Sequence, residues 1–284
     1  MLKIGKINAL KIAEQSDYGL YLCADTEGDE LTDKVLLPNR YCTEEMTIGS
    51  EVEVFVYKDS EDRVVATTET PIAMVGEFAY LRVRDVNRIG AFLDWGLSKD
   101  LLVPFAEQRS RMRVNGVYLV YIYVDHATGR IAATARIGKY IDNVPPEYKR
   151  GQAVQVLVTE RTDIGWRVIV ENKHRGMLYA NELYDSLRSG QRLTAYVKTV
   201  RHSDGRIDLT LTAPGVEGRA SSISNTIIEL LEKDNMPLTD KSSPDDIAAL
   251  LHCSKKDYKR AIGMLYKEHC ITIDSNTGAV KLAK

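Results

Sequence analysis

Two stretches of the sequence place aromatic rings beside arginine side chains. The first runs Tyr80-Leu81-Arg82-Val83-Arg84 and is followed by Phe92, and the second contains Arg161, Trp166-Arg167 and Tyr179. A flat ring can stack on an unpaired nucleobase, which is worth ~1–3 kcal/mol per base, and a guanidinium neutralises a phosphate. These residue types favour chemistry that holds a single-stranded nucleic acid.

The full candidate set lies between residues 72 and 213. Because side chains alternate along a strand, Leu81 and Val83 are expected to point inward and Tyr80, Arg82 and Arg84 outward. The residues that we predict to contact nucleic acid are Tyr80, Arg82, Arg84, Arg88, Phe92, Arg113, Arg130, Arg161, Trp166, Arg167, Lys173, Arg175, Tyr179, Lys198 and Arg206. The alternative is that the rings cap a core or pack between domains, while the charges are merely solvated.

The candidate residues belong to a unit that repeats along the chain. Gly19, Gly90 and Gly165 each open an apolar run, and they lie 71 and 75 residues apart. Three arginines that each precede another apolar run lie 67 and 76 residues apart, at Arg63, Arg130 and Arg206. Self-similarity at a nearly constant period is typical of tandem domains, and here it predicts three related units.

Each unit is predicted to contain five short strands. Apolar residues alternate or cluster in stretches rich in β-branched and aromatic types, and turn signals such as Thr128-Gly129 separate them. Five such strands suit a small closed barrel, because closure removes the exposed edges of an open sheet. The faces of Tyr118, Tyr121 and Tyr123 are ambiguous, and we favour packing in the core for all three.

After Ala213 the apolar period changes from that of strands to that of helices. Ser243-Pro244 begins one predicted helix, and Ser254-Lys255-Lys256-Asp257 resembles a capping box that opens another. Cys270–Asp274 and Ala279–Leu282 follow as a predicted hairpin. Three helices and a hairpin are the layout of a winged helix-turn-helix.

The last of these helices is predicted to have a basic face, formed by Lys256, Lys259, Arg260 and Lys267. This face lies opposite an apolar stripe, as it does in the recognition helix that winged helices place in a nucleic-acid groove. We therefore predict a second nucleic-acid face here, which suits duplex nucleic acid. The alternative is a solvated helix face or a surface for protein contacts, which winged helices also provide.

Several motifs of the repeats resemble S1-type RNA-binding domains, which are five-stranded oligonucleotide-binding (OB-fold) barrels. They are Gly76-Glu77 at the start of the second unit, Gly90-Ala91-Phe92-Leu93, Asp125 and Arg130-Ile131. The complete order, three S1-like barrels and then a winged helix, resembles the bacterial conserved virulence factor B family. That resemblance implies a cytoplasmic RNA-binding protein that influences gene expression.

The expected architecture is therefore multidomain and mainly β, with a small α/β tail. We predict three tandem S1-like OB-fold five-stranded barrels, followed by a winged helix-turn-helix domain. The expected domains are an acidic first barrel at 1–71, a second barrel at 72–140, a third barrel at 147–213 and the winged-helix domain at 216–284.

The S1 resemblance also implies an RNA face made of two aromatic residues on neighbouring strands, a following histidine and basic residues around them. Phe92 matches the aromatic of the second strand, and Tyr18 and Tyr21 match the aromatic pair in the first unit. Arg167 stands at the aromatic position of the third unit. The histidine position holds other residues in the three units, Pro38, Pro104 and Tyr179. No unit keeps the complete set, which argues against tight binding by a single barrel.

Charge is unevenly distributed along the chain. The sequence has 38 Lys and Arg against 40 Asp and Glu, a net charge of −2 that alone argues against a nucleic-acid partner. Residues 1–71 carry −8 (7 basic, 15 acidic), residues 72–213 carry +6 (21 basic, 15 acidic) and residues 214–284 are neutral. Since like charges repel over about one Debye length, ~8 Å at physiological salt, the first barrel should bind RNA poorly. We expect it to be a spacer, a protein-contact module or a discriminator against non-specific binding.

Other function classes find little support in the sequence. No apolar run approaches the ~18–20 residues of a membrane span and no signal-like segment is recognised, so we expect a cytoplasmic protein without a membrane partner. The common nucleotide-binding and hydrolase motifs are absent, so we expect neither an enzyme nor a cofactor. His252-Cys253 and His269-Cys270 could supply zinc ligands, but adjacent helical residues point about 100° apart, which favours half-buried thiols instead.

These observations predict an RNA-binding regulator. It would hold single-stranded or loop regions through the second and third barrels, with help from the winged helix, and act post-transcriptionally. The alternative is a DNA-binding transcriptional regulator whose winged helix reads a duplex while its barrels bind a partner. An RNA-processing enzyme is a third hypothesis, because an acidic metal site can be assembled from distant residues.

Overall fold

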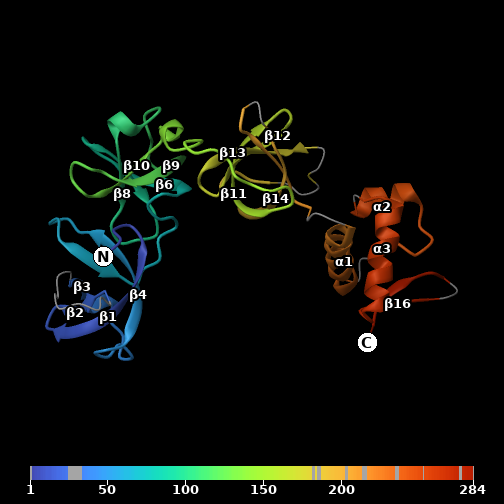
Figure 1. Ribbon diagram of the computed structural model, residues 1–284, viewed down its shortest axis with the longest axis horizontal. Coiled ribbons are helices and arrows are strands. Elements are labelled where there is room, and N and C mark those ends of the chain that lie inside the picture. The colour runs from blue at the N-terminus through green and yellow to red at the C-terminus, as the bar shows by residue number, and fades with distance from the viewer. Residues whose placement is uncertain are drawn as a thin grey trace. The chain divides into compact units, whose positions relative to one another are not determined.

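The computed structural model describes residues 2–24, 34–180, 183, 187–201, 204–212, 216–233, 237–251, 253–274 and 277–283. The chain forms two compact units, residues 1–143 and 144–284. Two five-stranded barrels make up the first unit, and a third barrel and a helical domain make up the second (Figure 1). No helix in the described part of the chain is long and apolar enough to cross a membrane.

The first barrel is closed, with its strands in the order β1-β2-β3-β5-β4. Buried residues such as Leu10, Ile12 and Leu22 alternate with more exposed neighbours, as a barrel wall requires. The strands are β1 (Ile7–Ser16), β2 (Gly19–Cys23), β3 (Val35–Pro38), β4 (Glu51–Lys58) and β5 (Val64–Thr67), with a 3-10 turn at Asn39–Tyr41.

The second barrel repeats this topology with one difference. Its strands form a five-stranded sheet in the order β10-β9-β6-β7-β8, and the two edge strands lie close together without a hydrogen-bonded ladder, whereas the equivalent β3 and β5 pair in parallel. The strands are β6 (Phe78–Val86), β7 (Gly90–Asp94), β8 (Leu101–Pro104), β9 (Val117–Val124) and β10 (Ile131–Thr134), with 3-10 turns at Phe105–Glu107 and Ile137–Lys139.

The third barrel is closed again, in the order β11-β12-β13-β15-β14. Its core contains Val156, Val168, Leu178 and Val197, each at most 2% exposed. The strands are β11 (Ala153–Thr162), β12 (Gly165–Val170), β13 (His174–Tyr179), β14 (Arg192–Val200) and β15 (Ile207–Thr210).

The helical domain has the predicted winged-helix order. The elements are α1 (Val216–Glu232), α2 (Pro244–Leu251), α3 (Lys255–Lys267), β16 (Ile271–Ile273) and β17 (Val280–Leu282). Ser254 caps α3, because its hydroxyl accepts a hydrogen bond from the Asp257 amide. The predicted apolar stripe of α3, Tyr258, Ala261, Ile262 and Leu265, is buried against the other helices and the hairpin.

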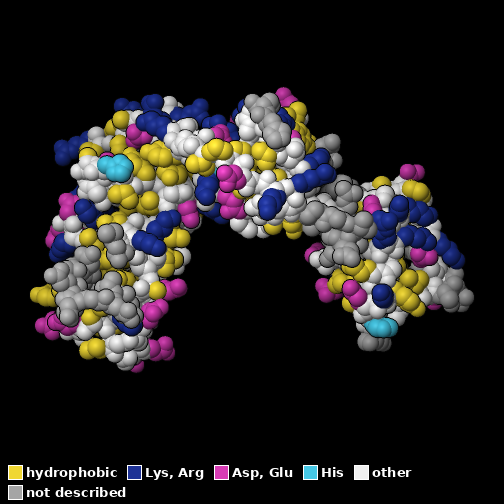
Figure 2. Space-filling view, in the orientation of Figure 1, with side chains coloured by type: hydrophobic (Ala, Val, Ile, Leu, Met, Phe, Trp, Pro, Cys, Tyr) yellow, Lys and Arg dark blue, Asp and Glu magenta, His cyan; other side chains and the backbone are white. Residues whose placement is uncertain are grey.

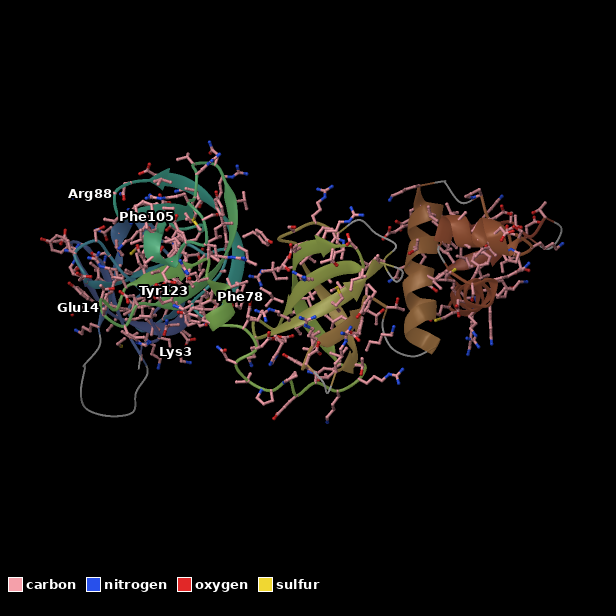
Figure 3. All side chains as sticks on the ribbon, turned by 90° about the horizontal axis from the view of Figure 1, so that it is seen from above. Lys3, Glu14, Phe78, Arg88, Phe105 and Tyr123 are labelled. Carbon is pink, nitrogen blue, oxygen red and sulfur yellow. The ribbon has the colours of Figure 1, made fainter. Side chains whose placement is uncertain are left out.

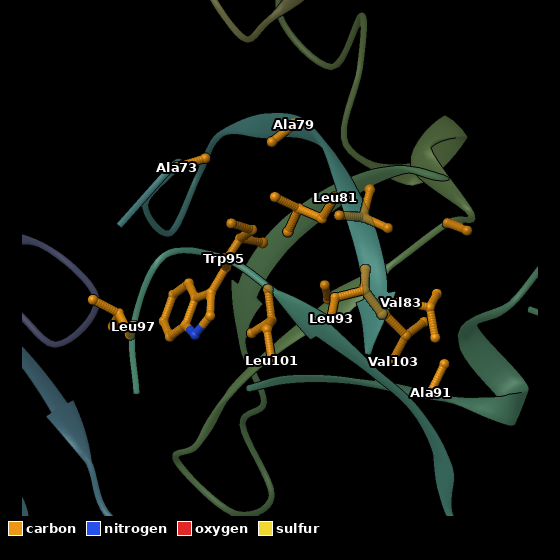
Figure 4. Packing of buried hydrophobic residues seen from close by; sticks show 14 of the residues in the cluster. Ala73, Ala79, Leu81, Val83, Ala91, Leu93, Trp95, Leu97, Leu101 and Val103 are labelled. Atoms are coloured by element: carbon orange, nitrogen blue, oxygen red, sulfur yellow. The ribbon is translucent and has the colours of Figure 1, made fainter. Parts of the chain in front are cut away.

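The core of the second barrel extends into the first barrel, whose other buried residues form a separate cluster of their own. Phe55 of β4, 1% exposed, packs its ring edge-on against Trp95, 2% exposed, with ring centroids 5.6 Å apart. Tyr57 and Val65 of the first barrel belong to the same cluster as Leu81, Val83 and Leu101 of the second. Figure 4 shows Trp95 and Leu97 at one end of this cluster, with Leu97 nearest the ribbon of the first barrel. The two barrels therefore pack together as one compact unit.

One interpretation of the tyrosines is wrong. Tyr118 packs at the end of the barrel core, as expected, because it faces the same side as Val120 and Ile122. Tyr121 and Tyr123 occupy the alternate positions of β9 and point outward, where Tyr140 stacks on them with centroids 4.1 and 5.9 Å apart. In Figure 3, Tyr123 and Arg88 are labelled at separate places on the second barrel. These two rings are half-buried because the segment after β10 covers them.

Candidate nucleic-acid interface

A glycine at the start of the second strand fixes the candidate face in each barrel. A Cβ on Gly90 would lie 2.3 Å from the Val103 carbonyl oxygen, and one on Gly165 would lie 2.1 Å from that of Leu178. Only glycine permits so close an approach of the two strands. The strand that starts there presents its third residue outward, and that residue is Tyr21, Phe92 or Arg167 in the three barrels.

The second barrel places Phe92 on the outer face as predicted. Leu81 is 1% exposed and Val83 is fully buried, while Arg82 and Arg84 are exposed, so the predicted alternation along β6 is confirmed. Phe92 is half-buried and lies opposite Leu102 of β8 on one side and Asp85 of β6 on the other. Part of its ring remains available for stacking. Tyr80, on the outward side of β6, is half-buried too.

Arg84 is already neutralised by two carboxylates. Its guanidinium pairs with Asp94 at 3.0 Å and with Asp100 at 3.0 Å. The hydrogen bond to Asp94 raises the pKa of the guanidinium, and the attraction of both carboxylates adds to it. A phosphate would have to compete with these two acids, so Arg84 is a weaker candidate contact than Arg82, which has no acidic partner in the described structure.

Arg130 is held by the acidic first barrel. Its Nε lies 2.6 Å from Asp62 Oδ1 and its Nη2 lies 2.9 Å from Asp62 Oδ2, a two-pronged ion pair. The hydrogen bond from Arg130 lowers the pKa of the Asp62 carboxyl. Lys99 Nζ donates to the Lys58 carbonyl at 2.9 Å across the same junction. An arginine predicted to contact RNA is therefore engaged between two barrels.

The third barrel holds Tyr179 in a polar cluster. Its hydroxyl donates to Asp208 Oδ1 at 3.0 Å, and Arg201 pairs with the same carboxylate at 2.9 Å while also contacting the hydroxyl. Burial raises the pKa of Tyr179, and the hydrogen bond to Asp208 raises it further. We did not predict Arg201, which lies just before the turn into β15 and reaches Tyr179 through its side chain.

Trp166 points to the other side of β12 from the predicted face. It is half-buried against the barrel core and lies opposite Leu178, which is 1% exposed. The prediction of an outer stacking ring at Trp166 is therefore wrong, because alternation from Gly165 puts it at the inward position that Ala91 occupies in the second barrel. The outward side chain is Arg167, which pairs with Glu160 at 2.8 Å.

The other predicted contacts lie on exposed parts of the barrels. Arg206 lies 3.5 Å from Asp204 within the turn before β15. The rest are exposed at loops or strand ends, namely Arg88, Arg113, Arg161, Lys173, Arg175 and Lys198. Figure 2 shows Lys and Arg side chains gathered over the second barrel and over the winged-helix domain, with Asp and Glu side chains around the first barrel. The Phe105 ring was not among the predicted contacts. The guanidinium carbon of Arg111 lies 4.2 Å from the centroid of this ring.

The basic face of α3 is present as predicted. Lys256, Lys259, Arg260 and Lys267 are all exposed, opposite the buried stripe. Lys259 pairs with Asp240 at 3.1 Å, and Arg260 lies 3.9 Å from Asp257. In the described part of the chain, no group of three or more His, Cys, Asp or Glu side chains could hold a metal ion, and His252 lies outside the described residues.

The first barrel presents a different surface at the equivalent place. Tyr18 is 75% exposed, and Tyr21 lies opposite Glu14, which pairs with Lys34 at 2.7 Å. Five of the acidic residues counted for this barrel lie at 25–33, outside the described residues.

Known proteins share both parts of this architecture. A model described as an S1 domain matches residues 4–69 and 75–136, and a model described as a CvfB-like winged helix domain matches residues 225–280. The chain is 31% identical over 281 residues to the uncharacterized protein YitL of Bacillus subtilis, which covers 94% of this chain and 90% of that protein. It is 28% identical over 251 residues to conserved virulence factor B of Staphylococcus aureus, covering 85% and 82% of the two chains.

A solved structure from Streptococcus pneumoniae covers 98% of both chains at 25% identity, with a TM-score of 0.40, and is titled a multidomain protein with nucleic acid binding domains. The S1 matches cover the first two barrels and the winged-helix match covers the helical domain, and the relatives extend the similarity over most of the chain, the third barrel included. The chain belongs to the conserved virulence factor B family, with tandem S1 domains and a C-terminal winged helix that make it a nucleic-acid-binding protein.

Proposed function

We propose that this protein binds single-stranded RNA through the outer faces of the second and third barrels and acts in post-transcriptional regulation in the cytoplasm. The observation that carries the proposal is Phe92, a half-buried ring on the outer face of a barrel within a segment of net charge +6. Stacking on such a ring does not require a paired base, and the surrounding arginines supply affinity for phosphates.

Single-stranded RNA is favoured over a duplex for this surface. A duplex hides the faces of its bases, so only an unpaired or looped base can lie flat on Phe92. The arginines with no acidic partner in the described structure, Arg82 and Arg88 among them, are the expected phosphate contacts. Those held by Asp94, Asp100 or Asp62 are expected to contribute less.

A second candidate function rests on α3. Its four exposed basic residues face away from the core as in a helix that enters a groove, and this favours duplex binding at the winged helix. In that case the barrels would bind a partner, and the acidic first barrel would offer a surface to a basic protein. The two functions predict opposite preferences for RNA single strands and DNA duplexes.

Fluorescence anisotropy separates these candidates. The full chain is titrated against a labelled single-stranded RNA and a labelled DNA duplex over a series of salt concentrations. Tighter RNA binding that weakens on charge reversal at Arg82 and Arg161, two exposed arginines with no acidic partner in the described structure, supports the proposal. Undetectable RNA binding at low salt, together with duplex binding that is lost on charge reversal at Lys256 and Arg260, favours the transcriptional alternative instead.

We expect binding without cleavage. Prolonged incubation of the RNA with the protein and divalent metal should leave the RNA intact on a denaturing gel. Cleavage activity that co-purifies with the protein would contradict this expectation and would favour the hypothesis of an RNA-processing enzyme.

A further inference from the structure

Each barrel carries an acidic residue beside the outward position of its second strand. The first strand of each barrel has a bulge, and the residue after it lies directly opposite that position. The pairs are Glu14 with Tyr21, Asp85 with Phe92 and Glu160 with Arg167. Opposite residues in antiparallel strands share a face, with Cβ atoms about 4.5–5.5 Å apart.

Only the carboxylate of the second barrel is left without a partner in the described structure. Glu14 pairs with Lys34 at 2.7 Å and Glu160 pairs with Arg167 at 2.8 Å. Asp85 is exposed and has neither an ion pair nor a hydrogen bond among the described residues. The guanidinium of its neighbour Arg84 is directed to Asp94 and Asp100 instead. Thus the barrel whose second strand carries a phenyl ring is also the one with a free carboxylate next to it.

A free carboxylate at this place repels phosphates but can accept hydrogen bonds from a base. A base stacked on the Phe92 ring lies parallel to it and directs its edge toward the flanking strands. Guanine offers two adjacent donors, N1–H and the N2 amino group, which match the two oxygens of a carboxylate. Adenine and cytosine each offer one amino group, and uracil offers one N–H between two carbonyl oxygens that the carboxylate repels.

We propose that Phe92 and Asp85 form a site for an unpaired guanine, in which the ring stacks on the base and the carboxylate accepts from N1–H and N2–H. This inference rests on the proposed RNA binding at the outer face of the second barrel. Asp85 is then a specificity-determining residue. Its main effect is to weaken the binding of uracil, and its gain in affinity for guanine is smaller.

The test uses three uridine oligonucleotides that differ at one central position. The centre is guanosine, inosine, which lacks the N2 amino group, or uridine. Anisotropy titration of the full chain should give about tenfold tighter binding of the guanosine oligonucleotide than of the uridine one, with inosine in between. In the Asp85→Asn variant, the three affinities should converge.

Glu44→Gln is the matched control. Glu44 is an exposed acid of the first barrel, and this substitution removes the same charge, so it should leave the order of the three oligonucleotides unchanged. Thermal unfolding of each variant shows whether the fold is intact. Because the Asp85 side chain is exposed and has no partner in the described structure, Asp85→Asn should leave the midpoint unchanged.

Two results overturn the inference while leaving the proposed function standing. One is measurable RNA binding with equal affinity for the three oligonucleotides. The other is an Asp85→Asn variant that tightens all three by the same factor, which would make Asp85 only a repulsive charge. A different result would contradict the proposed function itself. In that case the wild-type protein would bind none of the three oligonucleotides at low salt.

Discussion

The first and second barrels have the same strand order, the same bulge and the same glycine before the outward residue, yet they present opposite surfaces. Tyr21 of the first barrel lies beside a Glu14–Lys34 ion pair in a domain of net charge −8. Phe92 of the second lies beside a free carboxylate in a segment of net charge +6. The topology positions one outward side chain in each barrel, and the charges around it decide what that side chain can bind.

The two barrels also depend on each other. Phe55 and Trp95 place an apolar contact at the junction, and Asp62 and Arg130 place a charged contact beside it. The acidic barrel also occupies one of the arginines of its neighbour, Arg130. Removal of residues 1–71 would expose Trp95 and Leu97, so point substitutions test the comparison better than truncation does.

The largest expected effect is on the apolar contact at the junction of the two barrels. Trp95→Ala should lower the free energy of unfolding of the first unit by about 3–5 kcal/mol, because it removes a fully buried ring. Denaturant unfolding followed by far-UV circular dichroism measures this loss. The control is Tyr18→Ala, which removes a ring that is 75% exposed and should change stability by less than about 0.5 kcal/mol. Equal losses for the two variants would contradict the burial of Trp95 at this junction.

The next effect compares equivalent positions of the two barrels. Phe92→Ala should weaken binding of single-stranded RNA by about tenfold, since stacking on one ring is worth ~1–3 kcal/mol. Tyr21→Ala, the same change in the acidic barrel, should leave the affinity within about twofold. Anisotropy measures both constants. A loss at Tyr21 as large as that at Phe92 would mean that both barrels hold RNA despite their opposite charges.

A smaller and opposite effect is expected at the junction. Asp62→Asn removes the carboxylate that engages Arg130, so RNA affinity should rise about two- to fivefold and the salt dependence should steepen by about one phosphate contact. The gain should vanish in the Asp62→Asn, Arg130→Ala double variant. An unchanged affinity in Asp62→Asn would remove Arg130 from the set of RNA contacts.

The smallest effect is on alkaline stability. Burial, followed by the nearby Glu107, raises the pKa of Tyr123 to about 12. An unfolded tyrosine ionises near pH 10, so between about pH 10 and 12 the unfolded chain releases a proton that the folded barrel retains, and stability falls as pH rises. Tyr123→Phe should flatten the fall in the unfolding midpoint over this range. An unfolding midpoint that depends on pH in the same way in the wild type and in Tyr123→Phe would contradict the raised pKa of Tyr123.

The sequence predicted the barrels and the winged helix because both depend on local patterns. Glycine spacing located the second strand of each barrel, and alternation gave the inward and outward faces of β6. Arg167 stands at the outward position of β12 as expected, whereas Trp166, included among the candidate contacts, lies on the inner side by the same alternation counted from Gly165. Residue type alone does not assign a side chain to a face of a strand, whereas its position in the strand does.

The ion pairs could not be predicted in the same way. Asp62 and Arg130 are 68 residues apart and meet only because two barrels pack together, and Arg84 reaches Asp94 and Asp100 across the sheet. The stacking of Tyr140 on Tyr121 depends likewise on where the chain runs after β10. Charge counts along a sequence therefore find the basic barrel, whereas the arginines that remain free in it are known only from the fold.

The central claim is that the basic barrels, and not the acidic one, hold single-stranded RNA. The most direct test is the salt dependence of RNA binding for the wild-type chain, for Arg82→Glu with Arg161→Glu, and for Lys3→Glu, an exposed lysine of the first barrel. We predict that the double variant loses at least tenfold in affinity and has a shallower salt slope, while Lys3→Glu matches the wild type. Equal losses in the two variants, or no loss in either, would contradict the account.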